Sequence, residues 1–433
     1  MVTPGQLRRV ATRLQEYLAY CFDGMGRLER RRALGNYLRG LLLDGERKSL
    51  EPVAARLVNC SGEVDAMRQR LQQAVVVARW DEGELYRRVA ERFEASVEVA
   101  EAFVIDDTGF AKKGKHSVGV QRQYSGTLGR VDNCQVATSL HLASPAGGAC
   151  IGMQLYMPES WTQDEQRRRA AGVPDCVEFR TKIEISLQLL DRASSWGLRK
   201  RVVLADAGYG DNTDFREQLA ARDLTYVVGV NGTQLVWTGD EVCKPPVAGR
   251  GRSRWTYPGK PQSAKELMAS LPAANWRKST WGRGSLGPQS GRFAAVRIRT
   301  AHRYARGAAP GQEQWLLAEW PPSKAAPTKF WLASMPNSTP RKELVRLAKL
   351  RWRIERDYQE MKGELGLDHF EGRTWQGFQH HCACVAAAHA FLAIERARFP
   401  PEAADHHPAL QVSTTGRSPS HAWTLPPLPP HGR

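Results

Sequence analysis

Two short apolar runs, each ending in acids or an acid and a glycine, constrain the fold of this 433-residue chain more than any other feature. The first is AFVIDDTG, from Ala102 to Gly109, and the second is RVVLADAGYG, from Arg201 to Gly210. Short apolar runs bounded by turn residues are typical of buried strands. We therefore expect a strand at each run, with acidic side chains at its carboxyl end.

The segments around these runs alternate between strand and helix patterns. Further strands are expected at 118–124, 135–142, 149–156, 224–230, 315–319 and 330–334, and helices at 179–195 and 212–223. Several strands followed by a helix, a strand and a helix predict an α/β fold, with a mixed sheet flanked by helices.

The stretch LAKLRWRIERDYQEMK, Leu347–Lys362, has the spacing of one amphipathic helix. Thr339 and Pro340 predict its start, as an N-cap hydroxyl and a first helical residue. Apolar residues at steps of three and four form one face: Leu347, Leu350, Ile354, Tyr358, Met361 and Leu365. Arg351, Glu355 and Lys362 share a second face, where two cations flank one carboxylate. The alternative is a surface helix with intrahelical ion pairs.

The sequence pattern of the N-terminal region predicts helices. Residues 50–57, a turn at 59–62 and residues 64–77 predict a helix–turn–helix. Its second helix would carry four side chains able to read a major groove: Arg68, Gln69, Arg70 and Gln73. An ordinary helical hairpin with a solvated face is the alternative, and the pattern does not decide between the two.

The net charge of +17 indicates a polyanionic partner, nucleic acid first and an acidic membrane surface second. A basic proteome or a solubility effect is the competing explanation. No apolar segment follows the first basic residues, so no secretory signal is expected, and the apolar run at 383–394 is too short to span a bilayer. Eight scattered cysteines are typical of reduced thiols, and we expect a cytoplasmic protein.

Three acids stand out by position: Asp107 and Asp206 near the ends of predicted strands, and Glu355 on the predicted helix. Converging carboxylates repel one another unless a divalent cation lies between them. Carboxylate oxygens are ligands that Mg²⁺ or Mn²⁺ prefers, and two such ions about 4 Å apart can activate a water or a 3′-hydroxyl against a phosphate. A solvated or helix-capping acid is the alternative for each residue alone.

The order Asp…Asp…Glu resembles the DDE transposases of bacterial insertion sequences, whose catalytic domain has an RNase H-like fold. The resemblance runs from about Phe103 to Phe391 and is sharpest at the third acid. One branch of that family carries a tyrosine–arginine–glutamate–lysine signature with gaps of two, three and six residues. Arg351, Glu355 and Lys362 match it, while Ala348 stands at the tyrosine position.

The resemblance also implies roles for individual residues. In the family the first acid precedes a threonine, which selects Asp107 over Asp106, and Asp206 matches the second acid. Arg351 and Lys362 would position DNA, and Trp352 would handle a flipped base. Three lysines after the first acid are candidates to hold phosphate: Lys112, Lys113 and Lys115.

Composition and resemblance together predict five regions. They are a helical N-terminal DNA-binding domain at 1–98, a first part of the catalytic core at 99–230, a β-rich basic insertion at 231–312, a second core part with the Glu-bearing helix at 313–399, and a disordered tail at 400–433. In the insertion, basic residues alternate with tryptophans, which suits contacts to phosphates and bases, although a merely basic loop region is the alternative.

The implied reaction is phosphoryl transfer on DNA with Mg²⁺ or Mn²⁺, two ions being expected. Water would cut at the element ends, and the freed 3′-hydroxyl would attack target DNA. The resemblance further implies terminal inverted repeats and target DNA as partners, a homodimer on DNA, and a bacterial, nucleoid-associated location without a membrane. The alternatives are a domesticated or inactive nuclease and a DNA-binding protein.

A zinc site at His380, His381, Cys382, Cys384 and His389 is not expected. On one helix these residues point in several directions, and no second ligand pair follows at finger spacing.

Overall fold

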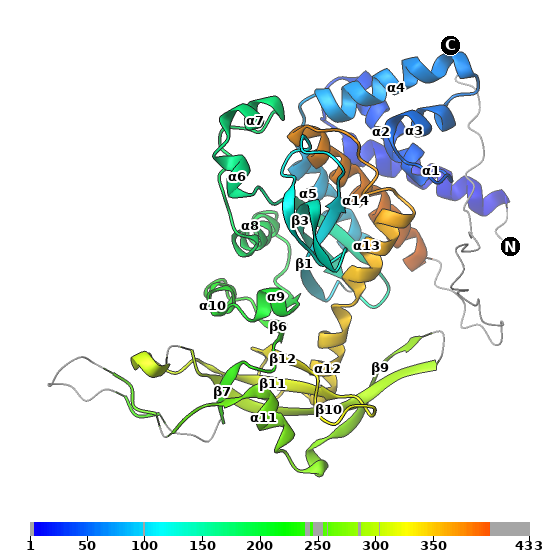
Figure 1. Cartoon of the computed structure of the whole chain (residues 1–433). Coiled ribbons are helices and arrows are strands. Elements are labelled where there is room, and N and C mark those ends of the chain that lie inside the picture. The colour runs from blue at the N-terminus through cyan, green and yellow to red at the C-terminus, as the bar shows by residue number, and fades with distance from the viewer. Residues whose placement is uncertain are drawn as a thin grey trace. The chain divides into compact units, whose positions relative to one another are not determined.

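The computed structural model describes residues 4–97, 100–238, 243–245, 254–257, 259–284, 287–302 and 304–398 (Figure 1). The tail predicted beyond residue 400 lies outside these ranges. The chain divides into two compact units. In its described part, the first unit takes residues from Met1–Ala100, Asp106–Leu198 and Arg353–Arg433, and the second takes them from Glu101–Ile105 and Arg199–Trp352.

The first unit contains the N-terminal helices, a group of strands and the last two helices. Its helices are α1 (Pro4–Phe22), α2 (Leu28–Leu42), α3 (Leu50–Leu57), η1 (Ser61–Glu63), α4 (Val64–Gln72), η2 (Gln73–Val77), α5 (Glu82–Ser96), α6 (Glu159–Thr162), α7 (Glu165–Ala170), α8 (Lys182–Ser195), α13 (Arg353–Gly363) and α14 (Trp375–Arg398). Its strands are the second half of β1 (Ala102–Ala111), β2 (Gln121–Ser125), β3 (Arg130–Ala143) and β4 (Gly148–Leu155).

Helix α14 is the centre of the first unit, because it is buried on all sides along most of its length. It packs against α2, α5 and β4. Tyr17 donates a hydrogen bond to the carbonyl of Ala387, and Tyr37 bonds the ring of His381 at 2.8 Å. The helical N-terminal region therefore shares a core with α14, since an apolar helix of this kind needs cover from neighbouring elements.

The predicted helix–turn–helix segment has the expected secondary structure: α3, a short 3₁₀ turn at η1, and α4 continued by η2. Gln69, Arg70 and Gln73 are exposed. Arg68 is tied to Asp65 one turn earlier at 2.6 Å. Whether this helix pair reads DNA stays a prediction.

The second unit is built on strands. They are the first half of β1, β5 (Val202–Ala205), β6 (Tyr226–Val230), β7 (Leu235–Thr238), β8 (Gln262–Ser263), β9 (Arg277–Gly284), β10 (Gly287–Thr300), β11 (Glu313–Trp320) and β12 (Lys329–Ala333). The helical elements are α9 (Ala207–Gly210), α10 (Thr213–Ala221), α11 (Ala264–Ala269), η3 (Ala273–Asn275), η4 (Tyr304–Arg306) and α12 (Arg341–Leu350).

The strands form one mixed sheet with the order β2-β3-β1-β5-β6-β12-β11-β10-β7-β8, and β4 and β9 pair with β3 and β10. β1 pairs with β5 and β5 with β6 in parallel, whereas β2 with β3, β3 with β4, β6 with β12 and β11 with β12 are antiparallel pairs. This arrangement confirms the predicted α/β class, a mixed RNase H-like sheet flanked by helices. The first apolar run is a strand, as predicted, but β1 continues to Ala111, so Asp106 and Asp107 lie inside it and not at its end. In the second run only Val202–Ala205 is a strand, and Ala207–Gly210 is the short helix α9.

The segment from 231 to 312 is rich in strands, as expected, but these strands extend the sheet of the second unit. β10 pairs with β11 over eight residues, from Arg292 opposite Trp320 to Arg299 opposite Glu313. Buried Phe293 and Ile298 give β10 an apolar side. The core strand β11 supplies the backbone partners of β10, and the cross-strand side-chain pairs add to the stability of the two strands.

The single helix predicted over Leu347–Lys362 is wrong. Helix α12 ends at Leu350, and α13 begins at Arg353 after a turn at Arg351 and Trp352. At the turn, the amide of Trp352 bonds the carbonyl of Lys349, three residues back, instead of continuing the α-helical pattern. The two helices belong to different compact units, and the break coincides with the boundary between these units in the sequence. The start also differs, since Pro340 is the N-cap and Arg341 the first helical residue.

Candidate catalytic site

Asp107 lies on β1, directly after the strand segment that pairs with β5. Its side chain is 24% exposed, and Oδ2 lies 2.6 Å from Nζ of Lys182, the first residue of α8. The neighbouring Asp106 carboxylate accepts a hydrogen bond from the amide of Asp107. Asp107 is therefore a partly open carboxylate that already faces a cation.

The backbone just beyond Asp107 is held by a small polar network within the first unit. The amide of Gly109 donates to Oγ1 of Thr127, and Lys362 Nζ donates to the carbonyl of Gly109 at 2.9 Å. A Cβ at position 109 would lie 1.9 Å from Oγ of Ser125, so only glycine fits. Burial lowers the pKa of Lys362 to about 8. Lys362 thus anchors α13 to β1, two residues from the predicted first acid.

Glu355 lies in the first turn of α13 and is exposed. The same helix turns Ile354, Asp357 and Tyr358 into the interior. Tyr358 bonds Oγ of Ser139 on β3 at 2.6 Å. The helix is thus fixed by one side and presents Glu355 on the other.

Asp206 belongs to the second unit, at the end of β5, where it is the N-cap of α9. Its Oδ1 accepts a hydrogen bond from the amide of Gly208 at 2.9 Å. A Cβ at Gly210 would lie 1.9 Å from the carbonyl oxygen of Gly229, so this glycine lets α9 lie directly on β6. The predicted second acid is therefore placed by a strand end and a short, tightly packed helix.

The structure does not gather the three predicted acids in one unit, because Asp107 and Glu355 belong to the first and Asp206 to the second. Among the described residues, no three His, Cys, Asp or Glu side chains are grouped so that they could hold a metal ion. In this structure the Asp107 carboxylate is paired with the ammonium of Lys182. Oxygen donors of this kind suit Mg²⁺ or Mn²⁺.

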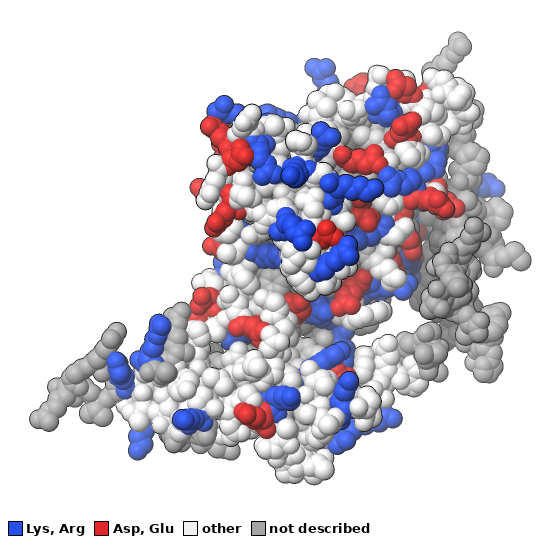
Figure 2. Space-filling model, in the orientation of Figure 1, with Lys and Arg blue, Asp and Glu red and all other residues white. Residues whose placement is uncertain are grey.

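The three predicted phosphate-binding lysines differ in their surroundings. Nζ of Lys112 donates to the carbonyl of Phe370, and burial lowers the pKa of this lysine. Lys113 and Lys115 are exposed. A pocket of about 440 Å³ opens beside them, lined by Arg47, Ala111, Lys112, Lys113, Gly114, His116, Ser117, Asp368, His369, Phe370, Glu371 and Arg373. Figure 2 shows Lys and Arg spread over the visible face, interspersed with acids.

Arg351 and Trp352 form the turn between α12 and α13 and belong to the second unit. The side chain of Trp352 is 58% exposed, unusual for a ring of its size. The ring is therefore not buried in the core, and its role in handling a base stays a prediction.

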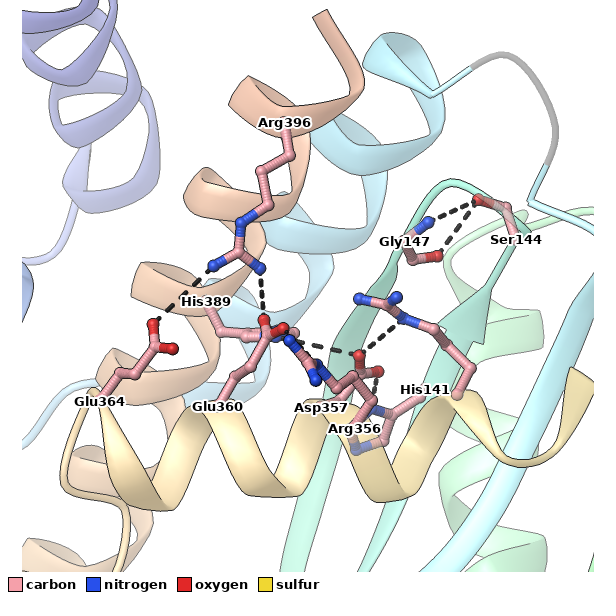
Figure 3. A network of polar contacts seen from close by, with 10 residues as sticks. His141, Ser144, Gly147, Arg356, Asp357, Glu360, Glu364, His389 and Arg396 are labelled. Carbon is pink, nitrogen blue, oxygen red and sulfur yellow. Dashed lines mark hydrogen bonds and ion pairs between the residues drawn. The ribbon is translucent and has the colours of Figure 1, made fainter. Parts of the chain in front are cut away.

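The sequence pattern did not predict a buried charge network that α13 forms with its neighbours (Figure 3). Asp357 Oδ2 lies 3.0 Å from Nδ1 of His141 on β3, and its Oδ1 lies 3.0 Å from Nε of Arg353. Glu360 faces His389 of α14 at 3.3 Å and is bonded to Arg396. The two acids were visible in the sequence, but their partners His141, His389 and Arg396 lie on other elements, far along the chain.

Charge interactions within this network shift the pKa values of its members. Burial alone would lower the pKa of His141, but Cys150 and the Asp357 carboxylate outweigh it and raise that pKa to about 9. Burial would raise the pKa of Asp357, and His141, His389 and Arg353 together bring it below its usual value. The network is therefore a set of paired charges, the form in which buried ions are tolerated.

No helix among the described residues has the length and apolar character needed to cross a bilayer.

Comparison with known proteins agrees with these features. A family model described as "DDE superfamily endonuclease" matches residues 21–288, more than half of the chain, and includes Asp107 and Asp206. The probable transposase for insertion sequence element IS701 of Microchaete diplosiphon is 29% identical over 202 residues, which cover 46% of this chain and 48% of that protein. The chain thus spans about half the length of the curated relative that it matches. The family match shows that this chain belongs to the DDE superfamily of endonucleases.

Proposed function

We propose that this protein is a DNA transposase that cleaves the ends of an insertion sequence and joins them to target DNA. Membership of the endonuclease family and the similarity to a protein named as a probable transposase support this function. The net charge of +17 supports DNA as the partner. We further propose that it acts as a homodimer on DNA in the bacterial cytoplasm.

The observation that supports the proposal is the parallel pairing of β1 with β5, two strands whose paired segments are each followed by an acid. β1 and β5 pair up to Val104 opposite Leu204, and each strand then runs within three residues to an acid, Asp107 or Asp206. Ligands and chemistry in α/β sheets gather at the carboxyl ends of such strands. Glu355, exposed on α13, would supply the third carboxylate.

These carboxylates would hold Mg²⁺ or Mn²⁺, which supplies Lewis-acid activation of a water and of a 3′-hydroxyl and charge stabilisation at the phosphate. The chain's own residues would bind and orient the DNA. Arg351 would offset negative charge at the transferring phosphate, and the exposed ring of Trp352 would stack on a base. Lys113 and Lys115 would contact the DNA strand, while Lys362 would hold α13 against β1.

Cleavage of supercoiled DNA that carries the segments flanking the gene tests the proposal. We would compare wild type with Asp107→Ala, Asp206→Ala and Glu355→Gln in Mg²⁺ or Mn²⁺. Glu165→Gln is the matched control, because Glu165 is an exposed acid whose ion pair with Arg169 lies within one helix. We expect wild type and control to cut at the ends and the three variants to bind DNA without cutting.

Two results would contradict the proposal. Cutting by the three variants at the wild-type rate would make the acids structural. DNA binding without cutting by wild type as well would favour a DNA-binding protein.

A further inference from the structure

Strands β2 and β3 of the first unit form a hairpin that presents an aromatic ring to solvent. Tyr124 on β2 is 62% exposed, and Val131, its cross-strand partner on β3, is 51% exposed. Directly paired side chains of two antiparallel strands lie on the same face. The two residues therefore form one small apolar surface on the hairpin.

The opposite face of the hairpin packs on β1. A Cβ at Gly109 would lie 1.9 Å from Oγ of the buried Ser125, and Oγ1 of Thr127 accepts a hydrogen bond from the amide of Gly109. Because side chains alternate along a strand, Ser125 faces β1 and Tyr124 faces away from it. Gly109 lies two residues beyond Asp107 on β1, so the hairpin packs beside the candidate site.

Cations border the Tyr124 face. Arg122 is exposed and lies two residues before Tyr124, hence on the same face. Asn133, the cross-strand partner of Arg122, donates through its side-chain amide to two carbonyls of the segment 112–115, at 2.5 and 3.0 Å. This tie brings the segment against the hairpin. It carries two exposed lysines, Lys113 and Lys115.

The negative charge of the hairpin lies on its other face. Asp132 is the one acid of the sequence from 121 to 134, and its cross-strand partner is Gln123, the neighbour of Tyr124. Its carboxylate is paired with Arg130 at 2.8 Å. The hairpin's own residues therefore give the Tyr124 face a positive charge and no acid.

An aromatic ring among cations suits a DNA strand with unpaired bases. Each base has a flat face that can stack on an aromatic side chain, while cations contact the phosphates between the bases. Tyr124 and Val131 offer an apolar surface that suits stacking more than the reading of base edges by hydrogen bonds. Inside a duplex the base faces are already stacked on one another.

We propose that the outer face of the β2–β3 hairpin binds unpaired DNA bases, with Tyr124 stacked on a base and Arg122 at a neighbouring phosphate. The inference rests on the proposed function, since it takes DNA as the partner. Cleavage of a strand frees bases from pairing, and the hairpin would hold such bases beside the candidate site.

The test compares the affinities of the full-length protein for two labelled DNA duplexes, measured by fluorescence anisotropy. One duplex ends in a short single-stranded overhang and the other is blunt. We expect Tyr124→Ala to bind the overhang DNA about ten-fold more weakly, the loss of one stacked base, and blunt DNA within about two-fold of wild type. Tyr124→Phe, which keeps a ring, should bind both like wild type. Tyr20→Ala is the matched control, because Tyr20 is a tyrosine of the same unit with 38% exposure.

A salt series separates stacking from charge. Arg122→Ala should reduce the slope of log affinity against log salt for the overhang DNA by about 0.7, the value for one phosphate of a single strand. Tyr124→Ala should leave this slope unchanged, because a stacked ring releases no counterions. Since Tyr124 is exposed, its replacement should also leave the unfolding temperature unchanged.

Equal affinity of Tyr124→Ala and wild type for the overhang DNA would overturn the inference. An equal loss for blunt and overhang DNA would overturn it as well, since the ring would then not act on unpaired bases. Failure of the proposed function gives a different result, in which wild type binds neither DNA. If wild type binds and cuts DNA and Tyr124→Ala does the same with equal affinity, only the role of the hairpin is wrong.

Discussion

The ammonium nitrogen of Lys362 lies 2.9 Å from the carbonyl oxygen of Gly109 and 3.4 Å from Oγ1 of Thr127. These contacts join α13, which carries Glu355, to β1, which carries Asp107. The signature lysine predicted to contact DNA therefore also has a structural task within the first unit.

Replacing Lys362 by Met should destabilise the fold. The carbonyl of Gly109 would lose a charged partner, which costs about 1–3 kcal/mol in the free energy of unfolding. Urea unfolding followed by circular dichroism measures this, with the exposed Lys113→Met as control and an expected change within about 0.5 kcal/mol. A Lys362→Met protein of wild-type stability but reduced DNA affinity would mean that Lys362 serves DNA alone.

The stability of the first unit should depend on pH through His141. Its pKa is raised to about 9 in the folded protein, by Cys150 and Asp357 acting against burial, so the folded state binds a proton that the unfolded state releases near pH 6.5. The stabilisation, on the order of 3 kcal/mol, is complete below pH 6.5 and declines until it is lost above about pH 9. Urea unfolding at several pH values should show this decline in wild type. A His141→Asn protein with the same slope would assign the pH dependence to other groups.

Gly148 should tolerate no side chain, because a Cβ there would lie 2.2 Å from Oδ2 of Asp357. Gly148→Ala must displace either β4 or the buried carboxylate, and overpacking of this kind costs about 1–3 kcal/mol. Gly147→Ala is the matched control, since its Cβ would meet Cβ of Ala393 at an ordinary 3.6 Å. Thermal unfolding of the two variants compares them directly. Equal unfolding temperatures would show that Asp357 moves aside without loss.

The basic pocket beside β1 should contribute to DNA affinity through phosphate contacts. Lys113→Ala or Arg373→Ala should weaken binding equally for all sequences and reduce the slope of log affinity against log salt by about 1. Fluorescence anisotropy over a salt series measures both quantities. Lys200→Ala, which removes an exposed cation of the second unit, should leave the slope unchanged. An unaltered slope for both pocket variants would exclude the pocket from the DNA path.

Some elements of the fold and candidate site could be predicted because local pattern is enough to define them. The apolar residues of the two runs, 102–105 and 202–205, lie in β1 and β5, since a short apolar run bounded by turn residues is typical of a buried strand. The buried face of α13, with Ile354, Tyr358 and Met361, follows from helical spacing alone.

Other features depend on partners far along the chain. The spacing of Leu347–Lys362 gave no sign of the break at Arg351 and Trp352, because each helix is held by a different unit. Lys362 meets Gly109 across 253 residues and Asp357 meets His141 across 216. No local spacing specifies such pairs.

The sequence by itself therefore determined the strands, the exposed and buried faces of the helices and the type of chemistry that three acids can perform. Only the tertiary structure decided which charges meet. Lys182 pairs with Asp107, His141 with Asp357, and His389 with Glu360. The physical reason is that helix and strand periodicity depends on neighbouring residues, while the pairing of buried charges depends on which distant segments desolvate them together.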